Sequence, residues 1–229
     1  MFLTKLTVNH RSAAFMRDAA DVHDMHRTLM SAYPKLPPTA TYRSTHGILW
    51  RIDTMPGGGI VQYVQSQTAP DWDRLPDGLL LKPAEVRSLR PVLDAIAPGR
   101  KFAFRLMANP TRDIRVEDGK EQRKRVPVRD PGAQIEWIIC KGEQHGFVIP
   151  ASRQGAPDVM SSPAPRLVGK RREPRRITID PVRFDGHLVV TDPSAFTEAV
   201  VNGIGRAKSY GCGLLTLAPA LSGENAMHP

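Results

Sequence analysis

The sequence predicts an α+β fold of two tandem ferredoxin-like (RRM-like) domains, each with the element order βαββαβ. Two observations support this. In the first half, short alternating runs of apolar and polar residues occur with segments of helical periodicity in that order, and the second half repeats it less clearly. The length of 229 residues also suits two domains of about 100 residues each. We expect an N-terminal domain at 1–129, a C-terminal domain at 133–219 and a flexible tail at 220–229.

The N-terminal half contains the clearer elements. Its first segment alternates Leu and Val with Thr and Lys, as a half-buried strand does. In the next segment Val22, Met25 and Leu29 fall on one helical face, and the glycines of 55–59 suit a tight turn between two strands. In chain order we expect a strand at 2–8, a helix at 21–32, strands at 48–52 and 60–65, a short helix at 84–97 and a strand at 101–106.

In the C-terminal half, Pro193 and Gly203 bracket the most clearly delimited helix. Prolines, glycines and basic residues predict a mobile basic hairpin or loop at 151–176. The remaining expected elements are a helix at 133–139, a short strand at 146–150, strands at 175–179 and 184–190, and a final strand at 213–218.

The composition excludes several classes of protein. The two cysteines, Cys140 and Cys212, are too few for a disulfide framework and predict plain thiols in a reducing compartment. No run of 18 apolar residues is present, and the first residues alternate instead of forming a signal-peptide block. The histidines show no metal-binding spacing. We therefore expect a soluble cytoplasmic protein with no metal, no cofactor and no membrane partner.

The net charge of +9 is concentrated in the middle of the chain. Residues 100–176 hold 18 Lys and Arg against nine Asp and Glu, whereas the rest of the chain holds 14 of each. Guanidinium groups match phosphate oxygens in pairs, so this segregation favours a nucleic-acid partner. A solvated basic surface without a partner is the alternative.

The helix expected at 21–32 carries two imidazoles near its start. His23 and His26 lie beside the apolar stripe with Arg27, and Asp21 and Asp24 suggest an N-cap and its reciprocal partner. The positive end of a helix dipole attracts phosphate, so the group suits phosphoryl transfer. Surface histidines without a catalytic role are the alternative.

A glycine-rich segment, Gly203–Gly213, follows the last expected helix and precedes the last expected strand. Arg206, Lys208 and Ser209 in this segment offer charge and hydrogen-bond donors to a phosphate, and the glycines allow close backbone approach. Nucleotide-binding glycine motifs instead follow a strand and open a helix. A helix C-cap followed by a bend is therefore an equal alternative.

Four segments together resemble a known family. They are Phe2–Leu6, Met25–Leu29, Phe104–Pro110 and Gly203–Pro219, and the glycine-rich segment with the helical histidine is the most specific. In this order, from the first strand to Pro219, they resemble CasE, the CRISPR RNA-processing endoribonuclease family of subtype I-E.

The resemblance implies two ferredoxin-like domains and a metal-independent endoribonuclease that cuts precursor CRISPR RNA at the base of the repeat hairpin. It implies 2′-hydroxyl attack, which leaves a 2′,3′-cyclic phosphate and a 5′-hydroxyl. It also implies that the product hairpin stays bound and that the protein is a Cascade subunit. The expected partners are therefore the CRISPR repeat RNA, as precursor and mature crRNA, and the other type I-E Cascade subunits.

The resemblance places the catalytic histidine of the family at His26. Relatives often have tyrosine at position 23, where this chain has His23, and arginine is common at position 107, where it has Met107. Imidazole titrates near neutral pH, so we assign His26 as the catalytic acid or base and His23 as its complement. The candidate RNA-binding residues are Arg27, Arg105, Lys170, Arg171, Arg172, Arg175, Arg176, Arg206, Lys208 and Ser209.

Two other functions stay open at this point. The protein could be a non-catalytic RNA-hairpin-binding subunit of a ribonucleoprotein complex, with the same fold and basic surface. It could also be a small-molecule enzyme that binds a nucleotide at the glycine-rich segment. Cleavage of a repeat RNA without metal distinguishes the first from the endoribonuclease, and nucleotide-dependent thermal stabilisation would support the second.

Overall fold

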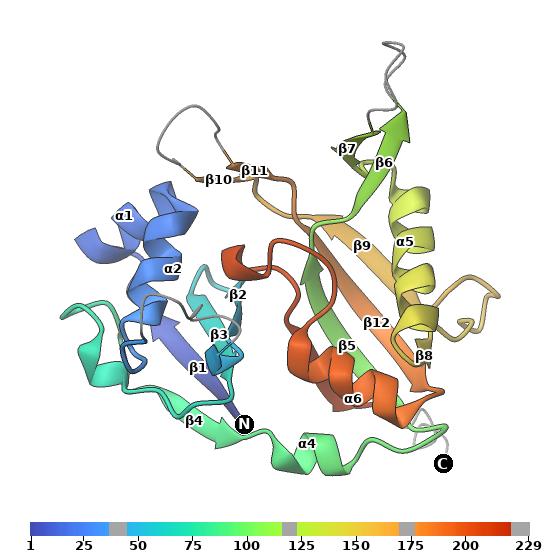
Figure 1. The fold of residues 1–229 in the computed structure, drawn as a ribbon, viewed down its shortest axis with the longest axis horizontal. Coiled ribbons are helices and arrows are strands. Elements are labelled where there is room, and N and C mark those ends of the chain that lie inside the picture. Colours follow the sequence, from blue (N-terminus) through green and yellow to red (C-terminus); the bar gives the residue numbers. More distant parts are fainter. Residues whose placement is uncertain (37–44, 116–122, 170–176, 221–229) are drawn as a thin grey trace, which may run out of the picture.

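The computed structural model describes residues 1–36, 45–115, 123–169 and 177–220. Two antiparallel sheets lie beside each other, one formed by the N-terminal strands and the other mostly by the C-terminal strands (Figure 1). Helices pack on each sheet, and their buried side chains form a hydrophobic core together with those of the strands. The mixed α and β composition and the two-sheet arrangement agree with the sequence expectation.

The first sheet has the strand order β2-β3-β1-β4. Its core is shared with two N-terminal helices, because Phe15, Met25 and Leu29 pack with Leu6 and Val64 of the strands. The elements of this half are β1 (Phe2–Val8), α1 (Ala13–Ala20), α2 (Val22–Met30), β2 (Leu49–Thr54), β3 (Ile60–Ser66), the 3-10 turn η1 (Trp72–Arg74) and β4 (Glu85–Ser88).

The second sheet has the order β13-β5-β12-β8, with β9 also paired to β12. Ile138 and Phe196 from two helices pack with Phe104 and Phe184 in its core. The elements are α4 (Arg90–Asp94), β5 (Lys101–Ala108), α5 (Pro131–Gln144), β8 (Phe147–Val148), β9 (Val159–Pro163), β12 (Val182–Val190), α6 (Pro193–Asn202), the 3-10 turn η2 (Lys208–Tyr210) and β13 (Leu215–Pro219).

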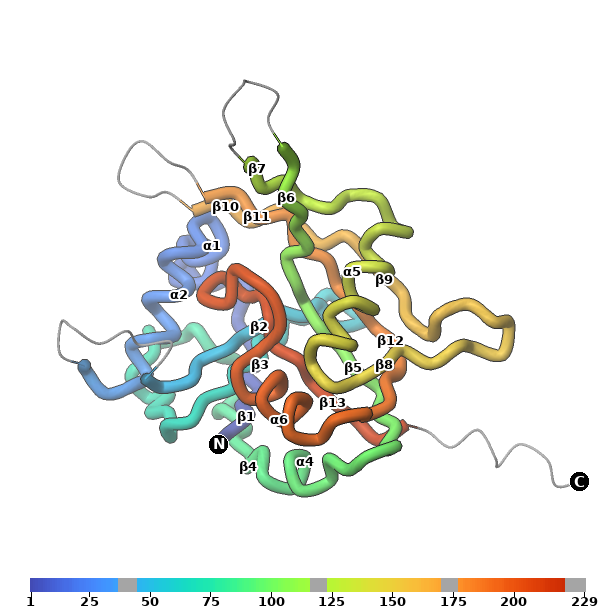
Figure 2. Tube along the Cα trace, turned by 45° about the vertical axis from the view of Figure 1, so that its right-hand side comes forward, coloured from blue at the N-terminus to red at the C-terminus, as the bar shows by residue number. Residues whose placement is uncertain are grey.

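Two short hairpins project from the same end of the molecule (Figure 2). One pairs β6 (Thr111–Arg115) with β7 (Arg123–Pro127), and the other pairs β10 (Leu167–Gly169) with β11 (Ile177–Ile179). Asp180, just after β11, accepts hydrogen bonds from Arg166 at 2.6 Å and Arg129 at 3.2 Å. These two bonds lower the pKa of Asp180 and fix the base of the second hairpin.

One sequence expectation about the sheets is wrong. The strand expected at 101–106 should have completed the first sheet, but β5 pairs with β12 and β13 of the second. Phe102, Phe104 and Leu106 point into the second core, so burial fixes this placement. The fourth strand of the first sheet is instead β4, which pairs with β1. The helix expected at 84–97 is present only as the shorter α4, at Arg90–Asp94, which follows β4. We propose that the domain boundary lies near 89–100 rather than at 129–133.

The other expected elements differ mostly in their ends. The strands at 2–8, 48–52 and 60–65 and the helices at 21–32 and 193–203 are present, and the helix at 133–139 is a longer α5. Local patterns in the sequence did not predict α1 or the β6–β7 hairpin. Within the hairpin or loop expected at 151–176, the structure forms β9 and β10, and β10 pairs with β11 as a hairpin, while 170–176 lie outside the described residues. The same holds for all of the expected tail except residue 220.

No helix in the described ranges is both long and apolar enough to cross a membrane.

The two cysteines differ in their environment. Cys140 is exposed, whereas Cys212 is buried and its burial raises the pKa of its thiol to about 12. The thiolate is the reactive form. In the native protein we expect a thiol reagent at pH 8 to label Cys140 within minutes and Cys212 only after unfolding. Mass spectrometry of the labelled peptides measures this, and equal labelling of both would contradict the burial of Cys212.

Candidate active site

The histidine pair lies at the start of α2. The Asp21 carboxylate caps the helix by accepting the backbone N–H of His23 at 2.9 Å. Val22, Met25 and Leu29 are buried, which leaves His23 and His26 half-buried beside the apolar stripe as expected. Asp24, expected as the reciprocal cap, has a carboxylate that accepts a hydrogen bond from the exposed Arg27 guanidinium.

The glycine-rich segment reaches across to this helix and brings Tyr210 to the histidines. The Tyr210 hydroxyl is 3.5 Å from Nδ1 of His23, and the two rings meet edge-on with centroids 5.1 Å apart. The ring of His26 is also edge-on to Tyr210, at 6.5 Å. The sequence analysis assigned no role to Tyr210, although this residue lies within the glycine motif. Only the fold shows that it meets α2.

Gly211 explains how the segment approaches the first sheet so closely. Its φ is +81°, and a Cβ at this position would lie 2.9 Å from the ring of Trp50 on β2. The indole N–H of Trp50 also donates to the backbone carbonyl of Ser209 at 3.2 Å. A segment from the C-terminal half is thus fixed on a strand of the N-terminal half, with Tyr210 between these two contacts.

A third element, the hairpin strand β10, closes on the same place. A Cβ on Gly169 would lie 2.8 Å from Cδ2 and 3.1 Å from Nε2 of His23, so a larger residue here would require the imidazole ring to shift. The Nε2 atom of His23 is buried and has no hydrogen-bond partner among the described residues. In the sequence, β10 is followed directly by 170–176, which holds the predicted cluster Lys170, Arg171, Arg172, Arg175 and Arg176; these five lie outside the described residues.

The cations of the glycine-rich segment lie around a different depression. Lys208 donates to the carbonyl of Asn202 at 2.8 Å and thereby caps the end of α6. Arg206 is exposed, and both residues line a cavity of about 400 Å³ with Trp137 and His145. Burial, together with the charges of Lys141 and Lys208, lowers the pKa of His145. The structure brings Tyr210, rather than Lys208, into ring contact with the histidines.

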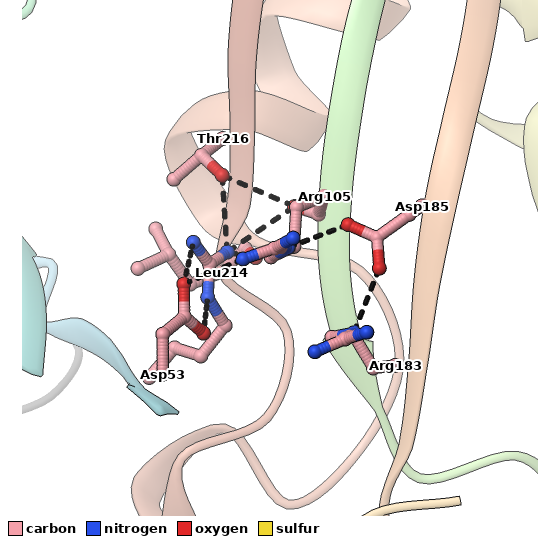
Figure 3. Close-up of polar contacts among 7 residues, drawn as sticks. Asp53, Arg105, Arg183, Asp185, Leu214 and Thr216 are labelled. Atoms are coloured by element: carbon pink, nitrogen blue, oxygen red, sulfur yellow. Dashed lines mark hydrogen bonds and ion pairs between the residues drawn. The ribbon is translucent and has the colours of Figure 1, made fainter. Parts of the chain in front are cut away.

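Arg105, another candidate RNA contact, belongs to an ion network between the two sheets (Figure 3). It donates to Asp185 on β12 and, at 3.2 Å, to Asp53 on β2. Burial opposes its charge, but the hydrogen bonds that it donates to these two carboxylates, and their negative charges, outweigh burial and raise the pKa of Arg105. This arrangement supports a structural role for Arg105.

The centre of the network is the buried pair Arg51 and Asp53. Both carboxylate oxygens of Asp53 accept from Arg51, at 2.8 and 3.1 Å. The remaining nitrogen of Arg51 donates to the carbonyls of Arg105 on β5 and Leu214 just before β13 and to the hydroxyl of Thr216 on β13, so it joins β2 to the second sheet. Burial is the main influence on this guanidinium and lowers its pKa. The sequence does not reveal this pair, because Arg51 and Asp53 alternate with the apolar Trp50 and Ile52 and so resemble the exposed face of a strand.

The histidine cluster has the groups that a proton-transfer site needs. Two imidazoles and a phenol converge from α2 and the glycine-rich segment, and imidazole can both accept and donate a proton near neutral pH. In the described part of the chain, no group of three or more His, Cys, Asp or Glu residues is arranged to hold a metal ion.

The chain resembles known proteins along nearly its whole length. A family model described as "CRISPR associated protein" matches residues 1–219. The CRISPR-associated endoribonuclease Cse3 of Thermus thermophilus is 32% identical over 227 residues, which cover 96% of this chain and all of the relative. The CRISPR system Cascade subunit CasE of Escherichia coli is 28% identical over 225 residues, with the same coverage of each chain.

The likeness extends to three dimensions. The structure of Thermus thermophilus Cse3 bound to an RNA that represents a pre-cleavage complex superposes with a TM-score of 0.76 at 31% identity. The match covers 95% of this chain and 98% of that one. The tandem ferredoxin-like fold class is thereby confirmed.

Proposed function

The chain belongs to the CRISPR-associated protein family of Cse3 and CasE, and from this we propose that His26 carries out proton transfer in RNA cleavage. The protein is a CRISPR RNA-processing endoribonuclease of the type I-E system. It binds the hairpin of the CRISPR RNA and is a subunit of Cascade, whose other subunits are its protein partners. We further propose that it acts in the cytoplasm, where its RNA substrate is transcribed.

The reaction follows from the chemistry of RNA. The 2′-oxygen upstream of the cut attacks the scissile phosphorus, the bond from phosphorus to the 5′-oxygen breaks, and a 2′,3′-cyclic phosphate and a 5′-hydroxyl result. One proton leaves the 2′-hydroxyl and another must reach the departing 5′-oxygen. Because the nucleophile belongs to the substrate, neither water nor a metal ion has to be activated. Positioned acids and bases are sufficient.

His26 is the better candidate for one of these transfers, and His23 is the candidate for the other. His23 lies one turn before His26, and the Tyr210 hydroxyl approaches its Nδ1 while Gly169 approaches the side of the ring that holds Nε2. Hydrogen bonds at catalytic sites are often long before substrate binds, and the 3.5 Å contact fits that pattern.

The RNA stem would contact the basic residues beyond the histidines. Strand β10 leads from Gly169 into the cluster at 170–176, and A-form stems are recognised mainly through shape and backbone phosphates. The exposed side chains of Arg27 and Arg206 remain candidate phosphate contacts. Lys208 would contribute through the shape of the glycine-rich segment, since its ammonium group already donates to the carbonyl of Asn202. Ser209 remains a candidate phosphate contact, because its bond with Trp50 uses the backbone carbonyl.

The convergence of α2, the glycine-rich segment and β10 on His23 and His26 is the observation that carries this proposal. The test is to incubate the protein with a labelled type I-E repeat RNA in excess EDTA. We expect one cut at the base of the hairpin, with the hairpin product still bound on a native gel. Binding without any cut would instead support the non-catalytic RNA-binding subunit.

Replacement of His23 tests the two-imidazole mechanism most directly. We expect His23→Ala to lower the single-turnover rate by about 100-fold or more, because a general acid or base contributes roughly 10² to 10⁴. The pH–rate profile should lose one of its two limbs. A rate and a profile like those of the unmodified protein would show that His23 is a bystander.

A further inference from the structure

An apolar cavity lies between the two sheets, next to the catalytic helix. Its volume is about 280 Å³, close to the lower end of small-ligand sites at roughly 300 Å³. Side chains from both halves line it, including Val22, Met25, Trp50, Met107 and Leu167. Apolar walls of this kind suit a flat aromatic ring.

Three elements of the chain connect the cavity to the histidine cluster. Each element that touches the histidines also lines the cavity through a neighbouring residue. Val22 and Met25 immediately precede His23 and His26, Gly211 follows Tyr210, and Val168 precedes Gly169. Consecutive Cα atoms are about 3.8 Å apart, so the cavity and the cluster are within the reach of one nucleotide.

One carboxylate lies in the wall of this cavity. Asp18 is 2% exposed, and within the described residues its carboxylate accepts two hydrogen bonds from Arg17, both on the same oxygen, Oδ1. The Arg17 side chain itself is 56% exposed. A buried carboxylate is costly unless its acceptors are used, so a ligand with N–H donors is favoured here.

We propose that this cavity binds a guanine base of the RNA next to the cut, with Asp18 accepting from its Watson–Crick edge. The inference rests on the proposed function. Guanine is the base that presents two adjacent donors, the N1 imino and the 2-amino group, to a carboxylate. Sequence-specific RNA recognition commonly uses splayed-out bases bound in this way.

The test couples a change in the RNA to a change in the protein. A series of repeat RNAs replaces one guanine at a time near the cut with inosine, which lacks the 2-amino group. At one position we expect inosine to weaken binding to the unmodified protein about tenfold, as for one hydrogen bond to a charged group. Asp18→Asn should bind both RNAs with the weaker affinity.

A second pair of variants tests the cavity without changing a buried residue. Ala19 lines the cavity and is exposed, whereas Ala20 is equally exposed and lies outside the lining. Ala19→Trp should abolish the inosine effect and Ala20→Trp should retain it.

Affinity is measured separately from cleavage, so the two proposals fail in different ways. An inosine effect that is absent at every position, or that is the same in Asp18→Asn and Ala19→Trp as in the unmodified protein, would overturn the guanine pocket. Absence of cleavage by the unmodified protein would overturn the proposed function instead.

Discussion

His26→Ala is expected to abolish cleavage of a type I-E repeat RNA in EDTA while RNA affinity stays within a few fold. The imidazole lies at the junction of α2 and the glycine-rich segment, beside Tyr210. Loss of the proton-transfer group removes a factor of roughly 10² to 10⁴ from the rate. Because the side chain is half-buried at the rim of the core, its truncation leaves the packing of Met25 and Leu29 unchanged.

The control for this variant is His10→Ala, which removes an exposed histidine outside the cluster. It should cleave at the rate of the unmodified protein. Single-turnover assays with RNA bound at saturation separate the chemical step from binding. Full activity of His26→Ala would rule out the catalytic assignment.

Asp53→Asn is expected to lower the free energy of unfolding by about 3–5 kcal/mol, because it leaves the buried Arg51 guanidinium without its counter-charge. The side chains of Arg51 and Asp53 are only 3% and 5% exposed. Arg105 would lose one of its two carboxylate partners as well. Urea unfolding followed by circular dichroism measures the change.

The matched control is Asp94→Asn, which neutralises the acid of the exposed pair between Arg90 and Asp94. Exposed pairs four residues apart on a helix contribute about 0.3–0.5 kcal/mol, so this variant should remain near the unmodified stability. An equal decrease in the free energy of unfolding in both variants would show that the buried network contributes no more to stability than an exposed ion pair does.

The same network bears on activity. Arg51 joins β2 to the second half through the carbonyls of Arg105 and Leu214, and its neighbour Trp50 holds the glycine-rich segment. The orientation of the two sheets thus determines where Tyr210 meets the histidines. We expect a variant that weakens this network, such as Asp53→Asn, to cleave RNA more slowly even at temperatures at which it remains folded.

Local patterns in the sequence predicted most elements but not all of their partners. The cap at Asp21, the apolar stripe of α2 and the Pro193 start of α6 are encoded within a few residues, and these helices are present. The placement of β5 depends on burial of Phe102 and Phe104 in a sheet whose next strand, β12, is distant in the sequence, which no local pattern shows. Strand β4 is exposed along its length and lacks an apolar signal.

The candidate site, too, was predicted only where residues close in the sequence determine it. His23 and His26 share one helix, so their proximity follows from helical spacing. Tyr210 is 187 residues from His23, and its contact depends on how Gly211 packs on Trp50. Arg105 lies in an alternating strand, where a charged residue is expected to face solvent. In the structure it instead donates to carboxylates on two other strands, Asp185 on β12 and Asp53 on β2.

The most direct test of the central claim replaces the 2′-hydroxyl upstream of the cut with hydrogen in an otherwise unmodified repeat RNA. Attack by that hydroxyl predicts no cleavage of the deoxy substrate at unchanged affinity, and a 2′,3′-cyclic phosphate on the upstream fragment of the normal RNA. Cleavage of the deoxy substrate, or an upstream fragment that ends in a 3′-hydroxyl, would contradict the account.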